Sequence, residues 1–220
     1  MDTSAARQAI FGRIRTAQKR SNEVSQNELE AVQDYLRHHP HGPQPHIGAD
    51  LIEHFTQQAL RMSDTVAEVA SMAQVPAAIA VYLDALGIAK QAIAWQTLDT
   101  LAWEQAGIAV AYRPPVNADL VGITGAFCAV AETGSLLLLS GPDTYASASL
   151  LPETHIAILP ASRIVAYMED AFALVRNERG ELPRATNFIS GPSRTGDIEQ
   201  TIVLGAHGPY RVHVIVVLDA

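Results

Sequence analysis

The chain begins with two stretches in which apolar residues recur every three or four positions. Residues 5–20 and 29–36 each place these residues on one stripe, which predicts two amphipathic helices. Ser4 is the expected N-cap of the first helix, because its hydroxyl can accept a backbone N–H. The two stripes are formed by Ala6, Ile10, Ile14 and Ala17, and then by Leu29, Val32 and Leu36.

A histidine- and proline-rich segment follows at residues 38–46. Three prolines within six residues exclude a regular helix there. We therefore expect residues 1–46 to form a helical arm and linker, and residues 47–220 to form one α/β domain. The histidines of the linker are metal-ligand residue types, but no regular element fixes their spacing. Adventitious binding is therefore favoured over a metal site.

From residue 47 onward, helical and strand-like patterns alternate. Strands that alternate with helices are typical of βαβ units, so we expect a mostly parallel sheet flanked by helices. Pro76 suits the first turn of a helix, and Gly87 suits its end. The patterns predict helices over 49–62, 76–86 and near 97–105, and strands over 65–69, 91–95 and 108–112.

The second half predicts further strands and a small antiparallel excursion. The tight-turn sequence Glu132-Thr133-Gly134 joins two of these strands as a hairpin. The last strand is apolar on both faces, which places it in the middle of a covered sheet. The strands are expected over 119–124, 127–131, 135–139, 155–159, 186–190 and 211–218, with a helix over about 162–176.

Composition and charge exclude several classes of protein. Of the 220 residues, 48% are apolar, and the net charge of −8 disfavours nucleic-acid binding that depends on Lys and Arg. Cys128 is the single cysteine, which excludes an intrachain disulfide and an iron–sulfur cluster held by this chain alone. No apolar run is long enough to span a membrane and no secretory leader is recognisable, so we expect a cytoplasmic protein.

The candidate chemistry is concentrated in the loop at 190–199. Glycines and a proline let this loop approach a ligand closely, and Ser193, Arg194 and Thr195 can then bind a phosphate or a carboxylate. Asp197 or Thr195 would cap a short helix whose N-terminus also favours anions. The alternative is a capped turn in which Arg194 pairs with Asp197 or Glu199. No GxSxG, HExxH, Walker or CxxC pattern offers a competing site.

A second candidate lies where the strand over 119–124 ends. Gly122, Thr124 and Gly125 stand near its carboxyl end, where open α/β sheets bind ligands. The glycine spacing is not that of a dinucleotide-binding GxGxxG motif. Close packing of one backbone segment on another is an equally good interpretation.

Glu132 and His207 are the candidate acid–base groups. Glu132, beside Thr133 and Gly134, stands in an apolar stretch where burial would raise the pKa of its carboxyl. A turn residue satisfied by its neighbours is the alternative. His207 precedes Gly208 in a run of small residues, where it can contact an anion, carry a proton, or simply bond to the backbone.

We expect the segments that carry these residues to converge on one pocket at the strand ends. Arg194 with Ser193 and Thr195 would bind a small anion there, and His207 would support it. His213, within the last strand, is expected to be a core histidine. The converging segments are 122–126, 132–135, 190–199 and 205–209.

Five motifs of the second half occur together and in a fixed order. They are Val121-Gly-Ile-Thr-Gly-Ala126, Ala129-Val-Ala-Glu-Thr-Gly-Ser135, Ser149-Leu-Leu-Pro152 with His155-Ile156, Ser190-Gly-Pro-Ser-Arg-Thr195 with Asp197-Ile-Glu199, and Gly205-Ala-His-Gly-Pro209. As a set, they resemble the lactate-utilisation protein C family, also called the YkgG type or LUD domain. The resemblance covers about residues 115–218.

The resemblance implies an α/β fold of the type shared by ribose-phosphate isomerase, glucosamine-phosphate deaminase and CoA-transferases. It also implies participation in the oxidation of L-lactate to pyruvate, alongside partner subunits that carry iron–sulfur clusters. We expect no covalently bound cofactor. Two alternatives stay open. One is a self-sufficient isomerase or acyl-CoA-transferase-like enzyme with Glu132 as base or nucleophile. The other is a non-catalytic scaffold or regulatory subunit, in which residues 5–20, with five of the fifteen Lys and Arg residues of the chain, form a basic arm that docks a partner.

Overall fold

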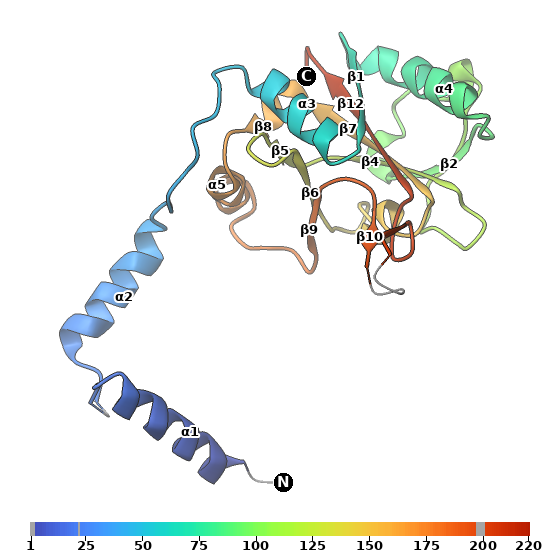
Figure 1. Cartoon of the computed structure of the whole chain (residues 1–220). Helices are drawn as coiled ribbons and strands as arrows, with labels where there is room; N and C mark the ends of the chain where they lie inside the picture. Colours follow the sequence, from blue (N-terminus) through green and yellow to red (C-terminus); the bar gives the residue numbers. More distant parts are fainter. Residues whose placement is uncertain (1–2, 22, 197–200) are drawn as a thin grey trace. The chain divides into compact units, whose positions relative to one another are not determined.

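A computed structural model describes residues 3–21, 23–196 and 201–220 of the chain. The chain divides into two compact units, Met1–Gln44 and Pro45–Ala220. Figure 1 shows the helices of the first unit and the sheets of the second. All candidate site residues that the structure describes belong to the second unit.

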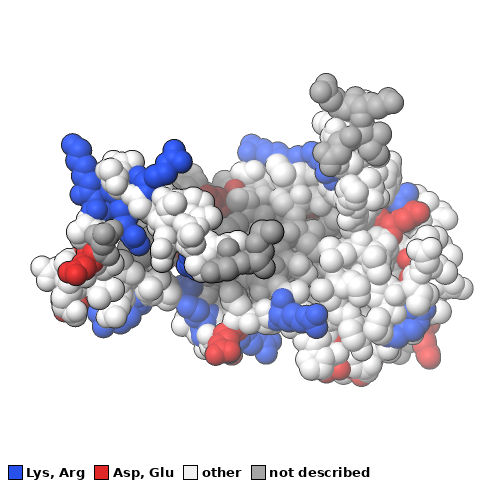
Figure 2. Space-filling view, turned by 90° about the horizontal axis from the view of Figure 1, so that it is seen from below, with Lys and Arg blue, Asp and Glu red and all other residues white. Residues whose placement is uncertain are grey.

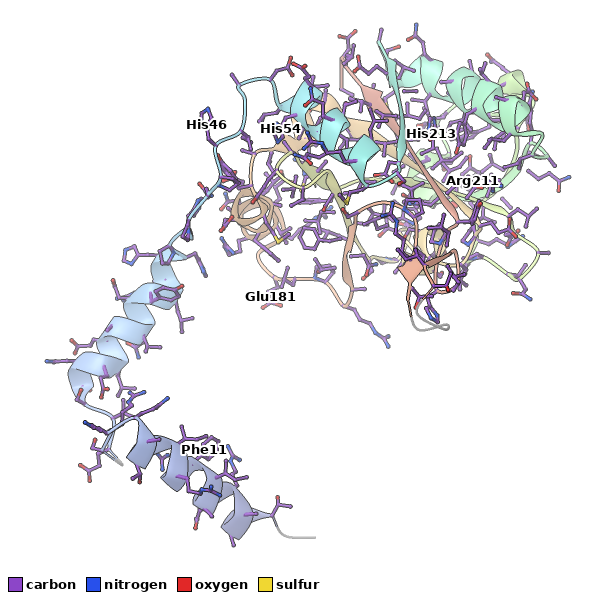
Figure 3. The ribbon with its side chains drawn as sticks, viewed as in Figure 1. Phe11, His46, His54, Glu181, Arg211 and His213 are labelled. Carbon is purple, nitrogen blue, oxygen red and sulfur yellow. The ribbon has the colours of Figure 1, made fainter. Side chains whose placement is uncertain are left out.

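The described residues of the first unit form two helices, α1 (Ser4–Ala17) and α2 (Gln26–His38). Thr3, and not Ser4, precedes the first turn of α1, and its side chain makes no capping bond. A reciprocal capping box between Ser25 and Glu28 begins α2 three residues before the predicted stripe. Neither helix has a buried residue, and Phe11, labelled in Figure 3, is an exposed aromatic of α1.

The second unit is built on a six-stranded sheet in the order β1-β12-β7-β4-β2-β3, and every neighbouring pair is parallel. The α/β fold with a mostly parallel sheet is therefore confirmed. The strands are β1 (Thr65–Val69), β2 (Gln91–Ala94), β3 (Ala109–Ala111), β4 (Val121–Gly125), β7 (Thr154–Pro160) and β12 (Arg211–Val217).

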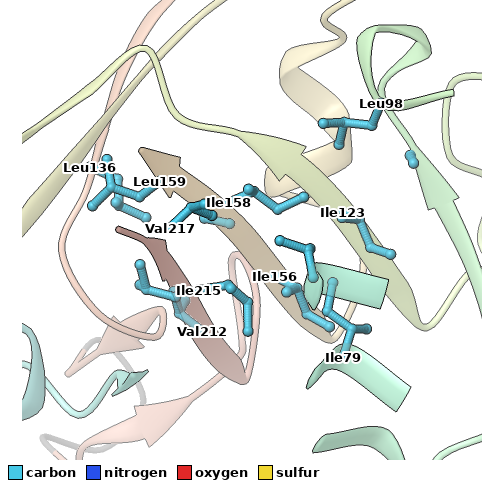
Figure 4. Close-up of a cluster of buried hydrophobic side chains, with 14 of the residues drawn as sticks. Ile79, Leu98, Ile123, Leu136, Ile156, Ile158, Leu159, Val212, Ile215 and Val217 are labelled. Atoms are coloured by element: carbon cyan, nitrogen blue, oxygen red, sulfur yellow. The ribbon is translucent and has the colours of Figure 1, made fainter. Parts of the chain in front are cut away.

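The central position predicted for the last strand is also confirmed. Strand β12 lies between β1 and β7, and its residues from Val212 to Val217 are all buried. Figure 4 shows Val212 and Ile215 of this strand among Ile156 and Ile158 of β7. Burying each such side chain contributes about 1.5–3 kcal/mol relative to leaving it exposed.

Helices α3 (Leu51–Arg61) and α4 (Val75–Leu86) pack against β1. Asp50 caps α3 by accepting the N–H of Glu53, and Gly87 ends α4 in the left-handed conformation. Helix α3 also contacts β8 (Ile164–Val165). It therefore bridges the main sheet and a second sheet.

The second sheet has four strands in the order β8-β5-β6-β9. Strands β5 (Cys128–Val130) and β6 (Ser135–Leu139) form the predicted antiparallel hairpin, and β9 (Thr186–Ile189) pairs with β6. A separate small core lies between this sheet and α5 (Met168–Arg179).

Two predicted helices are wrong in extent. The helix expected from residue 162 begins only at Met168, because residues 161–165 form the 3-10 turn η5 (Ala161–Arg163) and β8, which pairs with β5. The helix expected near 97–105 is replaced by two 3-10 turns, η2 (Gln96–Leu98) and η3 (Glu104–Ala106). The Trp103 indole donates to Leu98 O at 2.9 Å and closes the segment between them.

Four further short elements lie in the described part of the chain. The two-stranded ribbon of β10 (Arg194–Thr195) and β11 (Val203–Leu204) stands apart from both sheets. The 3-10 turns η1 (Met72–Gln74) and η4 (Ala146–Ser149) precede α4 and β7 respectively. No helix in the described part of the chain is long and apolar enough to cross a membrane.

Candidate functional site

The turn at residues 62–64, between α3 and β1, leads into the main sheet and contacts Gly191 and Arg194, which follow β9. We call it the α3 turn. Ser63 has a φ of +74°, which is rare for a residue with a side chain. Segments 132–135 and 190–195 both lie against this turn or the end of α3, and segment 205–209 is bonded to the second of them.

Two glycines allow this close approach. A Cβ at Gly134 would lie 2.5 Å from Ala59 N, and a Cβ at Gly191 would lie 2.2 Å from Met62 O. Both glycines have positive φ values, +69° and +79°. Each position therefore needs glycine both for its backbone conformation and for the space beside it.

Arg194 joins its loop to the α3 turn. Its Nη2 donates to Met62 O at 2.9 Å and to Ser63 Oγ at 2.5 Å, while the side chain as a whole is exposed. The expected alternative pairing with Asp197 or Glu199 involves residues that lie outside the described part of the chain.

Segment 205–209 is fixed to the same loop by two backbone bonds. Ser193 N donates to Pro209 O, and Gly205 N donates to Ser193 O, each at 2.9 Å. A Cβ at Gly208 would lie 3.2 Å from Ser193 Cβ, so the two segments are in close contact. His207 is exposed on this turn, and Thr195 is buried in β10.

Asp64, which sequence reasoning missed, is buried behind this loop. It is 4% exposed, and neither of its oxygens has a hydrogen-bond partner among the described residues. Burial raises the pKa of its carboxyl from 3.8 to about 7. The Gly191 N–H and the Arg194 guanidinium act against this rise in pKa. The Gly191 N–H therefore acts as a nearby dipole and does not reach hydrogen-bond geometry with either oxygen.

Glu132 lies on the segment that packs against the end of α3. It is half-buried, and its backbone N–H donates to Ala166 O at 3.0 Å. Thr133 Oγ1 donates to Ser135 Oγ at 2.8 Å, so this hydroxyl holds the turn together. The structure thus brings the Glu132 segment to the same helix end as the Arg194 loop.

The segment 122–126 does not lie with the other three. The expectation that four segments converge on one pocket is therefore wrong: only 132–135, 190–195 and 205–209 lie near the α3 turn and the end of α3. Gly122 packs closely on η4 and Pro152, with a Cβ position 2.1 Å from Ala148 O. Thr124 Oγ1 bonds to His155 Nε2 at 2.8 Å inside the sheet. Gly125 instead ends β4 beside Trp95.

Strand direction explains this separation. The α3 turn and segment 205–209 come just before β1 and β12, so they lie at the amino end of the parallel sheet. Gly125 closes β4, so it lies at the carboxyl end. Figure 3 shows Arg211 at the start of β12 and His213 further along the same strand.

His155 and His213 are both held neutral by the core. Burial lowers the pKa of His155 to about 3 and that of His213 to about 4. His213 stacks on Tyr82 with ring centroids 3.8 Å apart and bonds to Thr65 Oγ1, whereas its Nε2 has no partner among the described residues. The core position expected for His213 is therefore observed.

The described residues include no group of three or more His, Cys, Asp or Glu arranged to hold a metal ion. On the face shown in Figure 2, residues of both charge signs are spread over a largely uncharged surface, and several Lys and Arg residues lie close together on its left side. The chemistry of the site therefore depends on individual groups, above all Asp64 and Arg194.

These observations define an α/β protein with a parallel six-stranded sheet and a buried carboxyl beside a guanidinium at its amino end. The chain belongs to the LUD domain family, whose profile matches residues 52–217.

Curated relatives carry the name lactate utilization protein C. The protein of Shouchella clausii is 46% identical over 101 residues, which cover 45% of this chain and 44% of the relative. The protein of Bacillus subtilis is 42% identical over 102 residues, covering 45% and 42%. The chain thus aligns with less than half the length of these relatives.

A solved structure shows the same fold. The crystal structure of a DUF162 family protein from Deinococcus radiodurans superposes with a TM-score of 0.60 at 28% sequence identity. The match covers 79% of this chain and 99% of the other.

Proposed function

We propose that this protein acts in lactate utilisation, as a component of a system that oxidises L-lactate to pyruvate. Membership of the LUD domain family and the names of the curated relatives support this role. Within that role, the chain binds a small carboxylate or other anion at the α3 turn. Arg194 is the group that holds the anion, and Ser193 and Thr195 flank it.

The observation that carries this proposal is the buried carboxyl of Asp64 beside Arg194, which has no hydrogen-bond partner among the residues that the structure describes. With a pKa of about 7, Asp64 changes its charge at neutral pH. While Asp64 is ionised, it partly neutralises the attraction of Arg194 for an anion. Once Asp64 is protonated, the guanidinium charge is fully available, and a guanidinium forms strong, frequently bidentate hydrogen bonds with carboxylates and phosphates. Anion binding is therefore coupled to uptake of a proton by Asp64.

Oxidation of the lactate C2 hydroxyl to a carbonyl releases two electrons and two protons. The chain offers groups for binding and for holding a proton, but its single thiol is unsuited to cluster ligation, since burial raises the pKa of Cys128 to about 12. The electrons therefore pass to a redox partner, which we propose to be the iron–sulfur subunits of the system.

Glu132 and His207 remain proposed contributors to this site. Gly134, in the same segment as Glu132, lies against the end of α3, and Gly208, next to His207, lies against Ser193. Glu132 is the proposed acid–base group that a ligand reaches directly. His207, exposed on its turn, is the proposed second contact for the anion.

The test is calorimetric titration of the Arg194→Ala variant with L-lactate and with sulfate. We expect its affinity to be at least about ten-fold lower than that of the unmodified protein, since a charge-assisted contact is worth about 1.5–3 kcal/mol. Arg184→Ala is the matched control, because Arg184 is also an exposed arginine of this unit. Its affinity should stay unchanged.

Equal affinity of Arg194→Ala and the unmodified protein, together with intact lactate-dependent growth, would refute the anion site. Turnover of a sugar phosphate or an acyl-CoA by the purified chain alone would favour the isomerase or acyl-CoA-transferase alternative. Loss of complex assembly on deletion of residues 1–44, with lactate affinity intact, would favour a scaffold.

A further inference from the structure

A cavity of about 670 Å³ opens at the carboxyl end of the main sheet. We call it the carboxyl-end cavity. Trp95 follows β2, Gly125 ends β4 and Pro160 ends β7, so three neighbouring strands point into it. The hairpin strand β6, the loop after it and the end of α5 supply the other walls. These walls include Leu139, Pro142, Asp143 and Glu178, and Phe127, just before β5, and Arg163, at the end of η5, also line the cavity.

The topology of the sheet places this cavity at a switch point. After β2 the chain continues to β3, on one side, whereas after β4 the next strand of this sheet is β7, on the other side. Strands β2 and β4 are neighbours, so their outgoing connections diverge. In open α/β sheets, the crevice outside the carboxyl ends of two such strands is where ligands bind.

The walls are fixed by hydrogen bonds that leave the space between them open. Trp95 Nε1 donates to Tyr145 O at 3.0 Å, and Thr144 Oγ1 donates to Leu139 O at 3.0 Å. Arg163 Nε donates to Phe127 O at 2.8 Å. Because these polar groups are already paired, the cavity is preformed, and a ligand need not reorganise it.

The charges around the cavity do not favour a small anion. Arg163 donates two hydrogen bonds to the Glu178 carboxylate, at 2.6 and 2.9 Å, so these two groups neutralise each other. The remaining charged lining residues are Arg179, Asp143 and Glu181, one cation against two carboxylates. Glu181, labelled in Figure 3, lies just beyond the end of α5.

The cavity is also too large for lactate. Six non-hydrogen atoms occupy on the order of 180 Å³ if each takes about the volume of one water molecule in the liquid. The cavity, at about 670 Å³, is more than three times larger. This size is typical of sites for drug-sized molecules with an apolar body.

We propose that the carboxyl-end cavity is a second ligand site, separate from the α3 turn, which binds an uncharged or cationic organic molecule with an apolar ring system. Trp95, Phe127, Leu139 and the prolines supply the apolar contact. The carboxylates of Asp143 and Glu181 outnumber the Arg179 guanidinium by one negative charge, which disfavours anions at the same place. This inference goes beyond the proposed anion site and does not depend on it.

The test uses Nile red, an uncharged fluorescent ring compound, as the probe. Gly125→Val is the informative variant. Its new Cβ would meet the Trp95 ring at ordinary contact distances of 3.8 and 3.9 Å, so the backbone has room while the added methyl groups narrow the cavity. Gly48→Val is the matched control, because nothing lies within 4 Å of its Cβ position.

We expect saturable binding of one Nile red molecule to the full chain. The affinity should fall at least ten-fold in Gly125→Val and stay unchanged in Gly48→Val and in Arg194→Ala. Unchanged affinity in a folded Gly125→Val protein, or non-saturable binding by the unmodified chain, would overturn the proposal. Loss of Nile red binding in Arg194→Ala would show that the two sites are not separate.

A second pair of measurements does not depend on the folding of Gly125→Val. Anilinonaphthalene sulfonate is an anionic ring probe, and we expect it to bind at least ten-fold more weakly than Nile red. The exposed substitutions Asp143→Asn and Glu181→Gln together should raise its affinity at least three-fold and leave that of Nile red unchanged. Equal affinity for both probes, or no response to the double substitution, would contradict the charge argument.

Discussion

The two ends of the parallel sheet differ in packing: the amino end is tightly packed around a buried carboxyl, and the carboxyl end encloses an open cavity. At the amino end, the α3 turn brings backbone segments so close together that only glycine fits, and it leaves the Asp64 carboxyl without a hydrogen bond among the described residues. At the carboxyl end, the wall groups are paired and the space between them stays open. The amino end therefore holds a buried titratable group, Asp64, and the carboxyl end has space for a ligand.

The difference indicates what each end can do. A buried carboxyl with a pKa near 7 responds to a proton or to a nearby anion, whereas a rigid cavity lined by apolar side chains selects by shape and size. We expect substitutions at the α3 turn to change stability and its pH dependence. We expect substitutions at the cavity to change binding with little effect on stability.

The largest expected effect is that of Gly191→Ala. The added Cβ would lie 2.2 Å from Met62 O, and φ is +79°. Backbone strain and overpacking together predict a loss of about 3–5 kcal/mol in the free energy of unfolding, measured by urea denaturation. Gly180→Ala is the control, since its φ is +75° but nothing lies within 4 Å of the Cβ position. That variant should lose only about 1 kcal/mol. Similar losses in both would show that the α3 turn is not tightly packed.

Asp64→Asn should stabilise the protein above neutral pH. The folded protein holds the Asp64 proton more tightly than the unfolded chain, with pKa values of about 7 and 3.8. Ionisation therefore destabilises the folded state progressively as pH rises from about 4 to 7, by at most about 4 kcal/mol. Asparagine keeps the shape and cannot ionise.

The stability gain of Asp64→Asn over the unmodified protein should accordingly be near zero at pH 4 and about 2–4 kcal/mol at pH 8. Urea denaturation at both values measures it. The exposed substitution Asp143→Asn should leave the pH profile unaltered. A gain of the same size at both pH values would mean that charge burial is not its source.

The smallest expected effect is the change in the free energy of unfolding caused by a substitution in the cavity wall. Glu178→Gln removes the carboxylate that pairs with Arg163, but the two side chains are 39% and 26% exposed, so the loss should be about 1 kcal/mol or less. The freed guanidinium should nevertheless raise the affinity for anilinonaphthalene sulfonate about three-fold or more. Glu104→Gln, an exposed glutamate outside the lining, should change neither quantity. A large stability loss without a gain in anion affinity would contradict the separation of roles between the two ends.

Much of the fold could be predicted from local sequence pattern. The apolar run of β12 indicated a central strand, and the turn sequence at 132–134 indicated the β5–β6 hairpin. The start of α5 could not be predicted in this way, because residues 164–165 pair with β5, a contact that the local pattern does not encode.

The candidate sites were likewise predictable only where local sequence determines them. The motif around Arg194 was visible in the sequence as turn formers beside a guanidinium. Asp64 was not visible in this way, since its burial depends on the packing of Gly191, which is distant in sequence, against the α3 turn. Its one local signal is a polar Ser63-Asp64 pair directly before a strand. Gly125 was recognised as a strand end, but the cavity beside it depends on α5 and the loop after β6.

Calorimetric titration of L-lactate at pH 6 and pH 8, into the unmodified protein and Asp64→Asn, tests the coupling of Asp64 to Arg194 most directly. Lactate is fully ionised at both values. If only the protonated form of Asp64 permits binding, a pKa of about 7 predicts about ten-fold weaker binding at pH 8 for the unmodified protein. Asp64→Asn should bind equally and tightly at both. A pH-independent affinity in the unmodified protein, or the same pH dependence in Asp64→Asn, would contradict the account.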